Sequence, residues 1–138
     1  DVRKRSPYAA YDKVQFDEVL YNEGDSYARY MVRMKEIEQS LHILEQLVDN
    51  IPEGDYLAKT KPIIKVPEGR YFKEVEAARG AFGIYLESRG DKFPYRLKVN
   101  SPGFNLVGAV DHMTRGSKIA DLIAIGGSLD YVVPDIDR

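Results

Sequence analysis

The feature that most constrains this chain is a long segment, residues 25–50, whose apolar side chains recur every three or four positions. That spacing gathers them into one stripe along an α-helix. Asp25 is a suitable N-cap for this helix, and Pro52 and Gly54 require it to end near Asn50. The stripe follows a strict seven-residue repeat, which predicts packing against another long helix. The repeat consists of Tyr27, Tyr30, Met34, Ile37, Leu41, Leu44 and Val48.

The segments on either side of this helix predict little regular structure. Residues 1–24 form an arm in which Lys13–Leu20 alternates loosely, as in an irregular strand or an extended segment. Residues 52–69 are rich in proline and glycine and are typical of a linker. We therefore expect the sheet and the remaining helices to come from residues 70–138 alone.

The last half of the chain predicts a small antiparallel sheet followed by helices. Three strand-like runs are separated by Arg79-Gly80 and by Gly90-Asp91, as in a meander. Ser101-Pro102 then predicts the start of a helix that extends to about Arg115. Residues 117–128 are nearly all apolar, which predicts a short buried helix before the tail. The expected fold class is α+β, with one long helix, a small sheet, two short helices and a tail.

Composition excludes several kinds of chemistry. The 138 residues fit one domain, and because they begin at Asp1 rather than methionine we expect a fragment of a longer protein. The chain has no cysteine, so it forms no disulfide and supplies no thiolate ligand. A formal net charge of -2 gives no basic surplus for nucleic acid. No apolar run approaches the roughly 20 residues of a membrane-spanning helix.

Two histidines offer metal ligands, and neither has enough partners. Glu38 and Glu45 lie about one helical turn from His42, while His112 has only Asp111 beside it. A metal site needs three or four ligands, so a solvated histidine is the simpler interpretation of both positions. Taken as residues alone, Arg79 is a surface charge in a turn. The sequence therefore predicts no metal site.

Four collinear stretches resemble one known family. They are "DVRKRSPYAAYD", "GDSYARYMVRMKEIEQSL", "EAARGAFGIYLESRGDKFPYRLKVNSPGF" and "IADLIAIGGSLDYVVPDIDR". Together they resemble the C-terminal part of the hydrogenase-like large subunit of NADH:quinone oxidoreductase, respiratory complex I. That family is similar to the large subunit of nickel–iron hydrogenases. The chain departs from the usual family motif at Ala78 and Ala81, where proline and glutamate are common.

The resemblance matches the tail of this chain to the C-terminal metal-binding motif of hydrogenase large subunits. Hydrogenase large subunits end on an aspartate, two metal-binding cysteines and a histidine. On that pattern Asp130 matches the aspartate, Val132 and Asp135 replace the cysteines, and Arg138 replaces the histidine. Soft metal centres need soft ligands, so a valine and a carboxylate cannot hold this one. The resemblance also places Arg79 over the former metal site.

What the family does is implied for this chain by the resemblance alone. It implies a subunit of a membrane-attached complex that passes electrons from iron–sulfur clusters to quinone and couples this to ion translocation. The candidates for the quinone cavity are Arg79, Asp130, Val132 and Asp135. Quinone is then the substrate, this chain binds no metal, and NADH, FMN and the clusters belong to partner subunits. The iron–sulfur subunit beside the quinone site is the expected neighbour.

Three further expectations complete this picture. The chain lies peripherally on the cytoplasmic side of the inner (cell) membrane, contacts lipid only through partner subunits and binds no nucleic acid. Alone it is inactive, because the family's quinone-binding histidine and tyrosine lie outside this segment. The alternative is a metal-free assembly module of a related ferredoxin- or deazaflavin-dependent complex. For Asp130, the sequence leaves open a proton relay or an anchor for the tail, for instance through Arg79.

Overall fold

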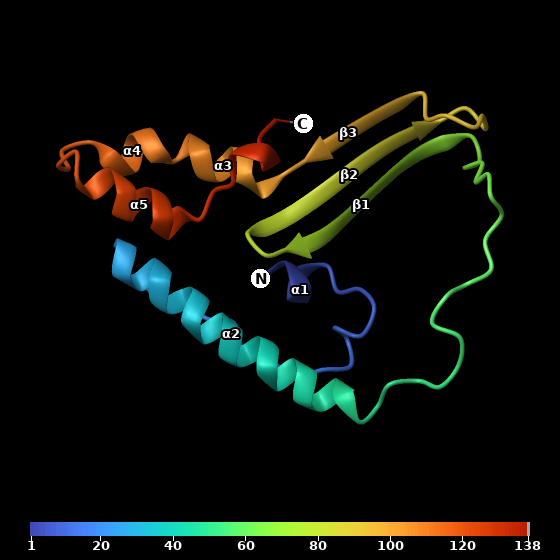
Figure 1. Ribbon diagram of the computed structural model, residues 1–138, viewed down its shortest axis with the longest axis horizontal. Helices are drawn as coiled ribbons and strands as arrows, with labels where there is room; N and C mark the ends of the chain where they lie inside the picture. The colour runs from blue at the N-terminus through green and yellow to red at the C-terminus, as the bar shows by residue number, and fades with distance from the viewer. Residues whose placement is uncertain (138) are drawn as a thin grey trace.

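The computed structural model describes residues 1–137 and confirms the α+β class (Figure 1). Helices and sheet form separate groups, with the three strands side by side and the short helices at one end of them. The elements in chain order are α1 (Val2–Arg5), α2 (Ser26–Val48), β1 (Gly69–Ala77), β2 (Gly80–Ser88), β3 (Arg96–Asn100), α3 (Pro102–Gly108), α4 (Val110–Thr114), α5 (Asp121–Leu129) and the 3₁₀ turn η1 (Val133–Asp135).

The long helix α2 begins as predicted and ends at Val48, two residues short of the expected limit. Its N-cap is confirmed, because the Asp25 carboxylate accepts the backbone N–H of Ala28 at 2.7 Å. Ala28 and Ile43 are buried on one face, which packs towards α5 and the arm. The predicted heptad stripe lies on another face, with side chains 41% to 69% exposed. Within residues 1–137 the strict heptad is therefore largely uncovered.

The arm departs from its prediction. Residues 13–20 form no strand, and a short helix, α1, occurs at Val2–Arg5 where none was expected. The arm instead runs along α2, where the backbone N–H groups of Gln15 and Asp17 donate to Oε1 of Gln46 and Gln39, each at 2.9 Å. Glutamine side chains thus take the place of a partner strand, and their role was invisible to a pattern of alternation.

The predicted meander is confirmed as a three-stranded antiparallel sheet in the order β1-β2-β3. Ala77 pairs with Gly80, so Ala78 and Arg79 form a two-residue hairpin tip. Gly80 has a φ of 138°, and a Cβ there would lie 3.2 Å from Pro102. Glycine therefore allows both the tip's backbone geometry and its close contact with the start of α3.

The single helix expected from Ser101 to Arg115 is wrong. Ser101 does cap it, accepting the Gly103 N–H at 3.3 Å, but the segment divides into α3 and α4 at Ala109. The Ala109 N–H donates to the carbonyl of Leu106 at 3.2 Å, three residues back, which tightens the turn and ends α3. The sequence has no proline at this point that would predict the break.

Helix α5 is shorter and less buried than predicted. It begins at Asp121, and Ile123 is 83% exposed although Ile125 and Leu129 are buried. One side of α5 faces α2, where Arg29 Nε donates to Ser128 Oγ at 2.9 Å. The expectation of a fully buried helix fails because this chain covers only that side.

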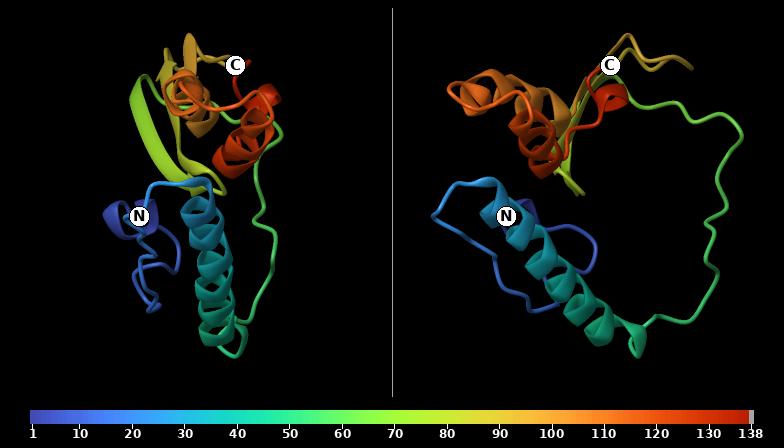
Figure 2. Two further views of the ribbon diagram at one scale, coloured as in Figure 1. Left: turned by 90° about the vertical axis from the view of Figure 1, so that its left-hand side faces the viewer. Right: turned by 60° about the vertical axis from the view of Figure 1, so that its left-hand side comes forward.

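Residues between α2 and β1 swing away from the other elements in an open arc (Figure 2). Residues 51–65 are all exposed, as expected of a linker. The arc is joined to the sheet near its end, where Ser88 Oγ donates to the Val66 carbonyl at 2.7 Å. Among residues 1–137, no helix combines the length and the apolar character needed to cross a membrane.

Candidate functional site

The hairpin tip and the tail meet at Arg79 and Asp130. Arg79 Nε donates to the main-chain oxygen of Asp130 at 2.6 Å and lies 3.2 Å from its Oδ2. The Arg79 side chain is 29% exposed and that of Asp130 is 41% exposed, so the pair lies at the edge of solvent. The structure therefore joins two residues that are 51 positions apart in the sequence.

The backbone of Asp130 gives the tail its direction. Asp130 ends α5 in the left-handed conformation, with φ 54° and ψ 38°, and its N–H donates to the Gly126 carbonyl at 3.2 Å. Among residues other than glycine, aspartate and asparagine tolerate this conformation best. The left-handed turn leaves the Asp130 carbonyl accessible to Arg79. The aspartate thus acts as a helix terminator as well as a charged group.

Two arginines of α2, Arg29 and Arg33, contact the C-terminal end of α5 from the side of the long helix. Arg33 Nε lies 3.9 Å from Asp130 Oδ2, a longer contact than that of Arg79. Arg29 holds Ser128 and also donates to the Gly24 carbonyl at 2.7 Å. The end of α5 is therefore tied both to the sheet and to the long helix, and the Asp130 carboxylate faces two guanidinium groups.

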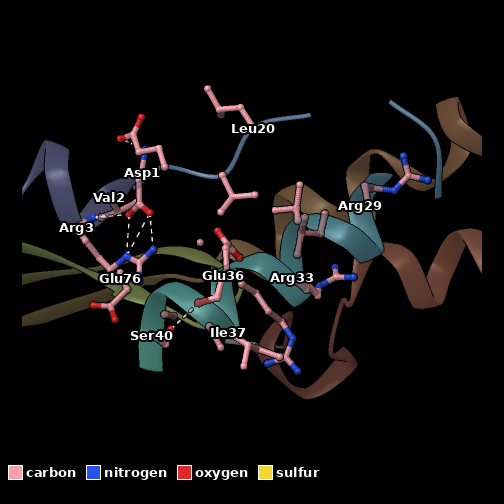
Figure 3. Close-up of a pocket in the computed structure, with 18 of the residues that line it drawn as sticks. Asp1, Val2, Arg3, Leu20, Arg29, Arg33, Glu36, Ile37, Ser40 and Glu76 are labelled. Carbon is pink, nitrogen blue, oxygen red and sulfur yellow. Dashed lines mark hydrogen bonds and ion pairs between the residues drawn. The ribbon is translucent and has the colours of Figure 1, made fainter. Parts of the chain in front are cut away.

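A groove of about 670 Å³ opens beside this junction. Figure 3 shows Arg29 and Arg33 on α2 at one end of the groove, with Asp1, Arg3 and Glu76 at the other. Its walls mix these charges with apolar side chains, namely Val2, Val19, Leu20, Val32, Ile37, Leu106 and Leu129. Such a surface could accept a largely apolar molecule that carries a polar end.

The predicted site residues occupy different places around this groove. Among the residues described, the lining includes Arg79 but not Asp130, Val132 or Asp135. Val132 is half-buried and extended, directly before η1. Asp135 lies against the start of α3, where a Cβ on Gly103 would come within 3.4 Å of its own Cβ. The structure thus unites Arg79 with Asp130, and the rest of the tail continues to α3.

Other parts of the prediction concern metals and the last residue. No cluster of three or more potential metal-binding side chains occurs within residues 1–137. Arg138, which the resemblance matched to a terminal histidine, lies outside the described residues. The absence of a metal bound to this chain stays a prediction.

Sequence reasoning missed Arg33 and Glu76. Arg33 lies outside the apolar stripe and belongs to no motif of the sequence, yet it points to the groove. Glu76 receives hydrogen bonds from Tyr8 and Tyr11, which lie 68 and 65 residues away. No local pattern predicts contacts over such separations. The only available signal was the run of tyrosines in the arm.

The sequence and the fold both place the chain in a known class of proteins, the subunits of respiratory-chain oxidoreductases. The sequence matches the family described as "Respiratory-chain NADH dehydrogenase, 49 Kd subunit" over residues 1–64 and 61–138. These two matches span the chain. The chain therefore belongs to this family, as the resemblance predicted.

Relatives from named organisms agree with this family. The chain is 68% identical to an NADH-quinone oxidoreductase subunit of Bacteroides fragilis, covering all of this chain and 26% of that protein. It is 55% identical to an NADH-quinone oxidoreductase subunit of Desulfotalea psychrophila, covering all of this chain and 37% of that protein. The chain thus spans about a quarter to two-fifths of the length of these relatives.

A solved structure shares the fold. It is described as the membrane-bound sulfane sulfur reductase, an archaeal respiratory membrane complex. One of its chains superposes with a TM-score of 0.90 at 41% identity, covering all of this chain and 39% of its own length. The same arrangement of elements is therefore present in a complex named for a different electron acceptor.

Proposed function

We propose that this chain forms part of the quinone-reduction chamber of a membrane-attached NADH:quinone oxidoreductase. The observation that carries the proposal is the junction of Arg79 and Asp130, two residues that the hydrogenase pattern places at a redox centre, beside a groove of mixed polarity. The names of relatives 55% to 68% identical to it supply the class of reaction. The chain contributes a wall and an anchored tail, while the redox groups belong to partners.

The role expected of such a wall is to bind and orient the quinone head group. A quinone head group is a flat ring with two carbonyl oxygens, and it needs an apolar surface with a few well-placed hydrogen-bond donors. Electrons arrive from an iron–sulfur cluster on a neighbouring subunit, and reduction consumes two protons. Val132 does not line the groove of this chain. We propose that apolar side chains of the tail, Val132 among them, would border the ring where partner subunits complete the chamber. Arg79, held by Asp130, would place positive charge where negative charge develops.

The partners follow from the same proposal. The iron–sulfur subunit beside the quinone site would contact the hairpin tip and the tail. Other subunits would carry NADH, FMN and the remaining clusters, and membrane subunits would carry out ion translocation. The chain would lie on the cytoplasmic side of the membrane, and it would be inactive without these partners.

A second candidate function follows from one observation. The structure with a TM-score of 0.90 belongs to a complex named for sulfane sulfur reduction. The fold therefore does not by itself select quinone as the acceptor. Under this alternative, the chain would be a metal-free packing module of a related membrane complex that uses another donor or acceptor. Substitutions in the tail would then change assembly rather than quinone kinetics.

The experiment compares two adjacent valines in the assembled complex. Val132 is half-buried, whereas Val133 is 66% exposed. Val132→Met should narrow the chamber and raise the concentration of a quinone-site inhibitor needed for half-inhibition by about tenfold, the usual scale for one bulky group in a pocket. Val133→Met is the matched control. Electron entry to a hydrophilic artificial acceptor should be unchanged in both variants.

The outcome separates the two candidates. A shifted inhibitor response in the Val132 variant alone supports the quinone chamber. Unaltered inhibition in a fully assembled Val132→Met complex would show that this valine does not border the quinone. Loss of assembly without any kinetic change in the assembled fraction would favour the packing module.

A further inference from the structure

Glu76, at the end of β1, holds two tyrosine hydroxyls at once. Tyr8 Oη donates to its Oε2 and Tyr11 Oη donates to its Oε1, each at 2.6 Å. Hydrogen bonds between a hydroxyl and a carboxylate belong to the strong, charge-assisted class, and these distances lie within its usual range of about 2.5–2.7 Å. Both oxygens of one carboxylate are therefore used to fasten the arm to the sheet.

The two tyrosines are themselves fixed. Their rings meet edge to face with centroids 5.2 Å apart, and Tyr11 packs in the same manner on the buried Phe16 at 6.2 Å. Between them Ala9 takes a left-handed conformation with φ 53°, and the Tyr11 N–H donates to the Tyr8 carbonyl at 3.1 Å. This tight turn carries the two hydroxyls to the same carboxylate.

Both hydroxyls are built to stay protonated. Desolvation, followed by the hydrogen bond to Glu76, raises the pKa of Tyr11 to about 12, against a small opposing effect of Arg3. The bond to Glu76 is the main cause that raises the pKa of Tyr8 above its ordinary value. A second contact also joins the arm to the sheet, because Arg5 of the arm forms an ion pair with Glu74 on β1. The tyrosines therefore remain donors throughout the neutral range.

Glu76 lies close to the tip of the hairpin. It pairs with Ala81, one step before the Ala77–Gly80 pair that closes the tip. Residues 76–80 all line the groove, and Arg79 at the tip reaches Asp130. A shift of Glu76 moves the tip, because the two-residue turn between Ala77 and Gly80 offers little freedom to compensate.

We propose that Glu76 is a positioning residue for quinone reduction: clamped by Tyr8 and Tyr11, it sets the hairpin so that Arg79 meets the Asp130 tail in its working geometry. This inference rests on the proposed function, because the reaction that it serves is the one proposed above. Tyr8 and Tyr11 would thus contribute to the site although neither of them lines the groove. Small misplacements of catalytic surroundings are known to lower rates steeply.

The test uses the complete subunit in the assembled complex. Tyr8→Phe and Tyr11→Phe keep the rings and each remove one hydroxyl, and the double variant frees the carboxylate. We expect a fall of about threefold in quinone-reduction kcat for each single variant and about tenfold for the double variant, with electron entry to the artificial acceptor unchanged. Tyr85→Phe is the matched control, because Tyr85 Oη lies 3.4 Å from Glu87 on the same sheet.

A double-mutant cycle then tests whether the residues act as one unit. In a Glu76→Gln background, removing either tyrosine hydroxyl should change kcat by less than twofold, because coupled residues are not additive. Wild-type kcat in each single tyrosine variant, measured per assembled complex, would overturn the proposal even if stability fell. If the double variant does not assemble, the single variants decide the question alone.

The failure of this inference can be told from failure of the proposed function. Arg79→Lys provides the comparison. If Arg79→Lys lowers quinone reduction while the tyrosine and Glu76 variants do not, the clamp is wrong and the chamber stands. If Arg79→Lys and Val132→Met both leave quinone kinetics untouched, the chamber itself is wrong.

Discussion

Arg79 contacts Asp130 through two chemically different groups, and each of the two roles that the sequence left open for Asp130 depends on a different one of them. The 2.6 Å bond ends on the main-chain carbonyl, whereas the carboxylate lies 3.2 Å away and is partly exposed. Exposed ion pairs contribute about 0–1 kcal/mol, and a sheltered hydrogen bond to a charged group contributes about 1.5–3 kcal/mol. The anchor for the tail is therefore mainly the arginine and the backbone.

This division predicts an order of effects for substitutions at the junction. Asp130→Asn keeps the carbonyl and should lower quinone reduction by about twofold, whereas Arg79→Gln loses both contacts and should lower it by about tenfold. Arg70→Gln is the matched control, since Arg70 is an exposed arginine on the same sheet, 3.8 Å from Glu87. Steady-state rates per assembled complex would show this. The reverse order, with altered pH dependence in Asp130→Asn, would instead indicate a proton relay.

The tyrosine clamp predicts a dependence on alkaline pH. The folded pKa of Tyr11, about 12, lies above the ordinary value of 10.0. Below pH 10 both folded and unfolded states hold the proton, so the contribution of Tyr11 to stability is complete. Between pH 10 and 12 only the folded state holds it, so this contribution falls as the pH rises.

The measurement is a ring-carbon NMR titration of the protein labelled at tyrosine. One tyrosine resonance should titrate with a pKa well above the ordinary value of 10.0. This resonance should be absent in Tyr11→Phe, and its pKa should be closer to the ordinary value in Glu76→Gln. Glu87→Gln should leave it in place. A Tyr11 resonance that titrates at or below the ordinary tyrosine pKa of 10.0 in the wild-type protein would contradict the hydrogen bond to Glu76.

At the scale of elements, α2 leaves most of its strict heptad without contacts from the other described residues, although Ile37 borders the groove. The stripe is exposed along its whole length, while the face with Ala28 and Ile43 meets α5 and the arm. An apolar stripe of this kind seeks a partner helix. In the whole subunit we expect a further part of the same polypeptide to cover it, since this chain spans only 26% to 37% of the length of those relatives.

The exposed heptad predicts that the 138-residue chain self-associates in isolation. Ile37→Lys combined with Leu44→Lys should shift it towards monomer in sedimentation velocity, because both residues lie on the stripe and are more than half exposed. Glu38→Gln combined with Glu45→Gln changes the charge equally without touching the stripe and should leave association intact. A wild-type chain that is strictly monomeric and binds no hydrophobic dye would count against this prediction.

Elements with strong local signals were predictable, and those set by distant contacts were not. Asp25, the heptad and the glycines of the meander are local, and the structure confirms the helix and the sheet that they predicted. The break at Ala109 follows a single glycine, Gly108, which does not by itself predict the end of a helix. The arm finds its partners in Gln39 and Gln46 rather than in a strand. The contact of Arg79 with Asp130 was one of several possibilities until a family resemblance singled out both residues.

At the scale of the whole molecule, the chain exposes more surface than a self-contained protein of its size. Its accessible surface is 11108 Å², whereas a folded monomer of its mass exposes about 7,300 Å². Its buried hydrophobic side chains are Phe16, Ala28, Ile43, Ile125 and Leu129 among those described. The excess agrees with a chain that spans a quarter to two-fifths of its relatives and needs their remaining parts to complete a core.

The central claim is that this chain borders the site where quinone is reduced, and photoaffinity labelling tests it most directly. The membrane-embedded complex, active in quinone reduction, is irradiated with an azide-bearing quinone analogue and its peptides are mapped. The account predicts label in peptides that contain Arg79 or residues 129–133, and loss of that label when excess quinone competes. Label that quinone competes away but that lies entirely in other chains, with none in this one, would contradict the account.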